Sequence, residues 1–178
     1  MNRLLRLFVV LAGTLALFGC SSMKIEDFAG KKPELKLEEY FAGRSRAWGI
    51  FEDRFANLRR EFTVDIEGTW DGRELVLDER FDYADGEKDR RVWRLTQVSP
   101  GVWEGRTEDA IGVARGRVAG NAFNFAYDIN LKMGDRRLKV HFDDWMYLQP
   151  DGILLNRAYV TKWGFDVGSV TLAFRRVP

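Results

Sequence analysis

The sequence predicts an all-β protein: an antiparallel up-and-down, lipocalin-like β-barrel of about nine or ten strands with a short N-terminal helix. Beyond residue 43, apolar and polar residues alternate in short segments, which is the period of a half-buried strand. Turn residues interrupt these segments about every 8 to 14 positions, so nearly every connection is short. A meander must protect its two edge strands, and closure into a barrel does so. A curved open sheet or a sandwich is the alternative.

The strands are expected between turn sequences. The clearest alternation runs from Phe123 to Leu131. Asp71-Gly72 is a dipeptide typical of hairpin turns, and Pro150-Asp151-Gly152 marks another turn. Together these patterns predict strands at residues 62–66, 75–83, 92–98, 102–108, 113–118, 123–131, 138–146, 153–163 and 169–176.

One or two helical turns are expected before the strands, at residues 33–41. Pro33 suits a first helical position, and Glu34 suits the positive end of a helix dipole. Gly43 would end the helix. Leu35 and Leu37 alternate as they would in a strand, which is the competing interpretation.

The N-terminus has the pattern of a lipoprotein signal peptide. Arg3 and Arg6 precede an apolar run of about eleven residues, and Gly19 stands directly before Cys20, the single cysteine. A charged region, an apolar region and a small residue before the cut are typical of secretory signals. The apolar run is shorter than the roughly 20 residues that span a bilayer. An ordinary signal peptide with an incidental cysteine, or an uncleaved anchor, is the alternative.

This pattern resembles a bacterial lipobox, although Phe18 is bulkier than the usual residue at its position. It implies cleavage between Gly19 and Cys20 and attachment of lipid to the Cys20 thiol, so that labelled palmitate would be incorporated. The expected organisation is a signal peptide at 1–19, a tether at 20–32 and a single barrel domain at 33–178. Ser21 implies, by resemblance to lipoprotein sorting in Gram-negative bacteria, a lipid anchor on the periplasmic face of the outer membrane.

Composition excludes several classes of protein. The chain has 28 Lys plus Arg against 27 Asp plus Glu, so no basic excess indicates a nucleic-acid partner. Aromatic residues make up 13% of the chain, far from the composition of a disordered protein. The six tryptophans are expected in core packing or at the barrel mouth, with ligand contact as the alternative. The sequence contains no cofactor motif, and no cofactor is expected.

Few residues are candidates for chemistry. His141, the only histidine, is in phase with the outward positions Lys139 and Asp143, so we expect a solvated strand residue. A zinc site is not expected without further histidines or cysteines. No residue is assigned a catalytic or metal-binding role.

Asp144 is the more informative acid. Adjacent strand residues point to opposite faces, so Asp143 and Asp144 cannot form a close pair, and Asp144 has the inward parity of Phe142. A buried carboxylate needs a partner. Arg157 shares the parity of Tyr159 on the next strand and is the candidate. Asp144, Arg157 and Tyr159 could form an interior ion pair, recognise a polar head group of a ligand, or take part in catalysis.

Several short motifs occur in an order that resembles a known family. They are Tyr40-Phe41-Ala42-Gly43, Gly49-Ile50-Phe51-Glu52-Asp53-Arg54, Asp78-Glu79-Arg80-Phe81-Asp82-Tyr83, Arg91-Val92-Trp93, Ala119-Gly120-Asn121 and Phe142-Asp143-Asp144-Trp145-Met146. The series resembles an uncharacterised proteobacterial lipoprotein family, domain of unknown function 3833. The resemblance implies a bacterial envelope protein with a lipocalin-like barrel, and it brings no catalytic residues.

Three functional hypotheses follow. The first is a membrane-tethered module that binds a lipid or other hydrophobic small molecule inside the barrel, with its mouth near the lipid surface. The second is a structural or accessory lipoprotein with a filled barrel that contacts another envelope protein. The third is an enzyme acting on lipid.

Overall fold

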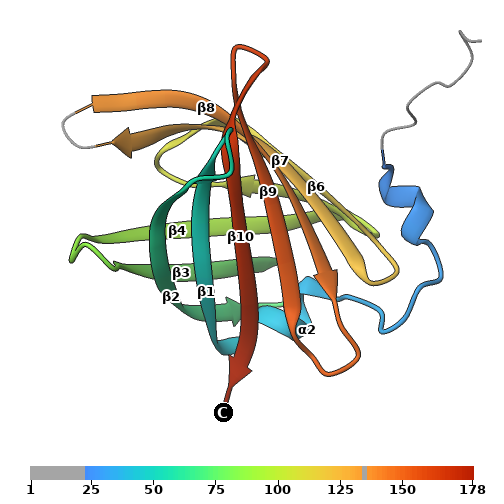
Figure 1. The fold of residues 1–178 in the computed structure, drawn as a ribbon. Coiled ribbons are helices and arrows are strands. Elements are labelled where there is room, and N and C mark those ends of the chain that lie inside the picture. Colours follow the sequence, from blue (N-terminus) through green and yellow to red (C-terminus); the bar gives the residue numbers. More distant parts are fainter. Residues whose placement is uncertain (1–22, 134–135) are drawn as a thin grey trace, which may run out of the picture.

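The computed structural model describes residues 23–133 and 136–178. These residues form a closed antiparallel barrel of ten strands, in which each strand pairs with the next and β1 pairs with β10 (Figure 1). The strands are β1 (Gly43–Asp53), β2 (Leu58–Trp70), β3 (Glu74–Tyr83), β4 (Lys88–Ser99), β5 (Val102–Arg106), β6 (Ala110–Ala119), β7 (Ala122–Met133), β8 (Arg136–Leu148), β9 (Leu154–Lys162) and β10 (Phe165–Val177). The predicted fold class, meander topology and closure are confirmed.

Closure depends on a long pairing between the first and last strands. The register of β1 with β10 runs from Arg44 opposite Val177 to Asp53 opposite Gly168. Both edges of the meander are thereby paired, which removes the unpaired backbone groups that an open sheet would expose. Because the strands alternate in direction, the loops after odd-numbered strands gather at one end of the barrel, and the loops after even-numbered strands gather at the other.

A short helix, α2 (Leu37–Phe41), covers the second of these ends. The hydroxyl of Tyr40 donates to the backbone oxygens of Phe174, at 3.1 Å, and Gly152, at 3.2 Å. Gly68 of β2 permits the backbone of the helix to approach this strand closely, since a Cβ atom there would lie 1.8 Å from the carbonyl oxygen of Phe41. We call this end the closed end and the opposite one the mouth.

The helix is shorter than expected, because residues 33–36 are not helical. The N–H of Leu35 donates to the carbonyl oxygen of Gly120 at 2.8 Å, so this segment is held against the β6–β7 turn before the helix begins. Leu35 and Leu37 are both about 1% exposed. Both leucines are buried, as the alternation implies, but residues 33–36 form no strand, and the expected helix begins only at Leu37.

A 3-10 turn, η2 (Ile25–Phe28), lies on the outer wall of the barrel, within the segment expected to be a tether. Ile25 packs against Ala122 of β7 and Trp145 of β8. At the start of the described chain, the Tyr147 hydroxyl donates to the sulfur of Met23 at 3.5 Å. The described N-terminus therefore lies beside the closed end. None of the helices in residues 23–133 and 136–178 has the length and apolarity to cross a bilayer.

Candidate functional site: the barrel interior

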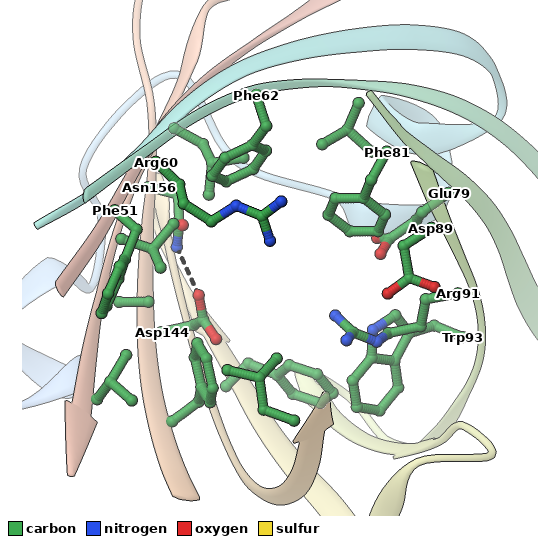
Figure 2. A pocket seen from close by; sticks show the side chains of 18 of the residues that line it. Phe51, Arg60, Phe62, Glu79, Phe81, Asp89, Arg91, Trp93, Asp144 and Asn156 are labelled. Carbon is green, nitrogen blue, oxygen red and sulfur yellow. Dashed lines mark hydrogen bonds between the residues drawn. The ribbon is translucent and has the colours of Figure 1, made fainter. Parts of the chain in front are cut away.

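The barrel encloses a cavity of about 830 Å³ (Figure 2). Near the closed end its wall is apolar and aromatic, formed by side chains that point inward from five strands and from α2. These residues are Leu37, Phe41, Val64, Ile66, Leu77, Trp93, Leu95, Phe123, Phe125, Leu172 and Phe174. Phe41 and Phe174 meet edge to face at 5.9 Å between ring centroids. The cavity therefore has an apolar floor, which the helix seals.

Further toward the mouth, the wall carries polar groups that we call the polar belt: Glu79, Arg91, Asp144 and Asn156. Glu79 of β3 stands directly opposite Arg91 of β4. The Arg91 guanidinium points into the cavity in Figure 2 and also donates to the Asp109 carboxylate at 3.0 and 3.2 Å. An amphipathic molecule with its chain on the floor would place its polar end at this belt.

Burial perturbs the two acids of the belt. It raises the pKa of Glu79 to about 7, since the effect of burial and of the nearby acids Asp144 and Asp109 exceeds the lowering by Arg91. Burial likewise raises the pKa of Asp144 to about 6. The Asn156 amide donates to Asp144 at 2.9 Å, which partly offsets the rise. Both acids therefore change protonation near neutral pH, as functional-site carboxyls often do.

Charged residues also line the cavity at the mouth. Arg60 of β2 donates to the carboxylates of Asp85, at 2.7 Å, and Glu87, at 2.9 Å. Its guanidinium lies 3.6 Å from the centroid of the Tyr83 ring. Arg60 thereby links the β3–β4 turn to β2 across one side of the opening.

The prediction for Asp144 and the prediction for its partners have different outcomes. Asp144 is 6% exposed and faces inward, as expected. Arg157 and Tyr159 face outward, so their expected place in the interior is wrong. Arg157 donates to the Thr171 hydroxyl at 2.9 Å, and Tyr159 is 49% exposed. Asn156 donates a hydrogen bond to the Asp144 carboxylate, and Arg157 does not.

The error has a simple cause. The buried residues of β9 are Leu154, Asn156, Ala158 and Val160. This phase places a polar amide inside and leaves Leu155 and Tyr159 outside, so these two residues indicate the wrong face, whereas Leu154, Ala158 and Val160 indicate the right one. The proposed trio of Asp144, Arg157 and Tyr159 shares no cavity. Likewise, the filled interior required by the accessory-protein hypothesis is not what the barrel contains.

Glu79 and Arg91 were not predicted from the sequence. Their position along each strand indicates that they face inward. Glu79 lies on the same strand face as Leu75, Leu77 and Phe81, and Arg91 lies on the same face as Trp93. A charge in the apolar phase of two consecutive strands indicates facing interior groups.

Other expected features lie elsewhere. His141 is on the outer wall, 2.8 Å from the Asp128 carboxylate. Within the described parts of the chain, no group of three or more His, Cys, Asp or Glu side chains is arranged to hold a metal ion. Trp93 lines the cavity, whereas Trp163 is 85% exposed. Gly19 and Cys20, the expected processing and lipid-attachment residues, lie outside the described residues.

Comparison with models of protein families gives a match. The family model described as "Protein of unknown function (DUF3833)" matches residues 14–176. No curated protein matches the chain. The match covers all four residues of the polar belt and every strand of the barrel except the last residue of β10.

Proposed function

We propose that this chain, which belongs to the DUF3833 family, binds one lipid or similar hydrophobic small molecule in the cavity of its barrel. The description of the family assigns no function, so the proposal rests on the cavity. The observation that supports this most is an apolar cavity of about 830 Å³, sealed at one end and open at the other. Ligand pockets of roughly 300–1,000 Å³ with mostly apolar walls and a few convergent polar groups are typical of small-molecule sites.

The arrangement of the wall suggests how such a ligand lies. An acyl or alkyl chain would contact the aromatic floor around Phe41, Phe125 and Phe174. Each methylene removed from water contributes about 0.8 kcal/mol. The polar end would reach Glu79 and Arg91, where both a carboxyl group and a guanidinium are accessible from the cavity.

We also propose that Cys20 is lipidated and anchors the mature protein to the outer membrane, facing the periplasm. The support is the sequence pattern around Gly19 and Cys20. Three residues span at most about 11 Å, and Met23 lies beside the closed end. An anchor at Cys20 would therefore hold the closed end of the barrel near the membrane. This geometry does not support the expectation that the mouth lies next to the anchoring membrane.

Extraction of the purified protein followed by mass spectrometry tests the binding proposal. We expect a co-purified lipid or other apolar molecule at close to one molecule per chain. Val64→Phe, which projects a ring into the cavity, should lower this ratio. Val76→Phe, on the outward face of β3, is the matched control and should leave it unchanged. Equal loading of both variants, or no bound molecule in any form, would contradict the proposal.

The anchor has its own test. Cells that express the protein with labelled palmitate should incorporate label into the wild-type chain and not into Cys20→Ser. Label retained in Cys20→Ser would contradict lipidation at that thiol.

A further inference from the structure

The most exposed large apolar side chains of the described residues gather at the mouth. Trp163 is 85% exposed, Phe165 74% and Phe55 71%, whereas no other large apolar side chain in residues 23–132 and 137–178 exceeds 53%. We call Phe55, Trp163 and Phe165 the aromatic rim. None of the three lines the cavity, so the ligand proposed above does not account for their exposure.

The aromatic rim is one surface, although its residues are far apart in the sequence. Phe55 is in the β1–β2 loop, and Trp163 and Phe165 are at the β9–β10 turn. These loops adjoin because β1 pairs with β10, and the Arg54 N–H donates to the carbonyl oxygen of Val167 at 3.0 Å. Two loop tips thus project aromatic rings from the same side of the mouth.

The backbone at the tips exposes these side chains at a cost. Trp163 has φ of 54° and precedes Gly164 with φ of 80°. A hairpin turn of this type favours Asn-Gly or Asp-Gly, and a positive φ is an outlier for a bulky residue. Such strain without a packing reason indicates a function for the exposed indole.

Positive charges accompany the rings. The Arg54 guanidinium lies 4.7 Å from the Phe55 ring centroid, and the Lys162 ammonium lies 4.4 Å from the Trp163 ring centroid. Among the described residues, neither cation forms a salt bridge. The acids Asp85 and Glu87 stand on the β3–β4 side of the mouth and are bound to Arg60. The mouth therefore carries the aromatic rim and two cations on one side, where Asp166 is also exposed, and paired acids on the β3–β4 side.

We propose that the aromatic rim and its two cations, Arg54 and Lys162, bind the surface of a lipid bilayer that contains anionic lipids. Tryptophan and other amphipathic rings are favoured at the head-group level, where the ring is buried and nearby cations meet lipid phosphates. Separate loop tips fit a deformable bilayer better than the flat core of a protein interface. Since the rim and Met23 lie at opposite ends of the barrel, the start of the described chain lies away from the docked surface.

Vesicle flotation tests the proposal. Residues 23–178 contain every strand, both helical turns and the whole cavity, so this chain can be studied without the acyl anchor. We expect it to float with vesicles of phosphatidylcholine and phosphatidylglycerol, and weakly with phosphatidylcholine alone. Combined Phe55→Ser, Trp163→Ser and Phe165→Ser should weaken binding by at least about tenfold, since burial of even one aromatic side chain contributes that much.

Matched controls separate the rim from general hydrophobicity. Combined Trp48→Ser, Leu155→Ser and Tyr159→Ser remove three outer-wall side chains that are 43–49% exposed and should leave flotation unchanged. Arg54→Gln with Lys162→Gln should remove most of the preference for anionic vesicles, at about fivefold for each charge. Circular dichroism checks that every variant is folded.

Three results would overturn the proposal: flotation that survives loss of the rim, flotation lost equally in the outer-wall control, or a dimer in solution that the rim variant abolishes while wild-type protein ignores vesicles. The last result would identify a second copy of the chain as the occupant. Cavity loading, measured by mass spectrometry on the same variants, should stay unchanged in each case. A failed rim and a failed cavity are therefore distinguishable.

Discussion

The two ends of the barrel use aromatic residues in opposite ways. At the closed end, Tyr40 and Phe41 are 6% and 4% exposed and hold α2 against the strands. At the mouth, Phe55 and Trp163 are more than two-thirds exposed and contact little of the barrel. The difference shows that apolarity alone does not reveal whether a residue stabilises the fold. Burial at one end supports the cavity floor, and exposure at the other leaves side chains free to bind.

The sharpest test of this contrast is a pair of identical substitutions. Phe41→Ala should lower the free energy of unfolding by about 3–5 kcal/mol, the usual cost of deleting a buried phenyl ring. Phe55→Ala should change it by less than about 0.5 kcal/mol. Urea denaturation followed by circular dichroism measures both values.

A similar cost at the two positions would break the comparison. If Phe41→Ala were mild, the helix would not be a structural floor, and lipid loading should then be checked for leakage at the closed end. If Phe55→Ala were severe, the β1–β2 loop would be part of the core.

The polar belt between the two ends predicts a pH dependence of stability. Glu79 has a pKa of about 7 in the folded protein and an ordinary value of 4.5. Since the folded value is the higher one, the stability that Glu79 contributes is complete below about pH 4.5 and is lost as the pH rises through 7. Glu79→Gln should thus be more stable than wild type at pH 8, by on the order of 2–3 kcal/mol, and the difference should shrink toward pH 4.5.

Thermal unfolding across this pH range measures the effect. Glu67→Gln, on the exposed face of β2, is the control and should show little change with pH relative to wild type. Parallel curves for wild type and Glu79→Gln would show that Glu79 does not titrate in the folded barrel.

The sequence is informative about the wall of the barrel and much less so about its contents. Alternation at 123–131 and the turn at Asp71-Gly72 report on local strand and hairpin geometry, which depends on neighbouring residues alone. A meander of short hairpins then favours closure. The start of α2 could not be predicted, because the hydrogen bond from Leu35 to Gly120 is a contact between distant residues.

The prediction of which residues lie inside the barrel was wrong in part. The phase of β9 is misassigned because Asn156 is inside and Tyr159 is outside, although Leu154, Ala158 and Val160 mark the inward face. Whether the barrel is filled or hollow depends on how side chains from ten strands meet across its axis. No local pattern contains that information.

The smallest expected effect on stability concerns Trp163, at the mouth. Trp163→Asn should stabilise the protein by about 0.5 kcal/mol, because asparagine tolerates the left-handed backbone that tryptophan adopts at φ of 54°. The gain is limited by the loss of the contact with Lys162, worth roughly 0.5–1 kcal/mol at an exposed site. The same substitution should weaken vesicle binding, so stability and binding should change in opposite directions.

Trp48→Asn, on an outward strand position, is the control and should instead destabilise the barrel without affecting vesicle binding. Destabilisation by Trp163→Asn would mean that the indole packs on the barrel and that the mouth resembles the closed end more closely than its exposure indicates.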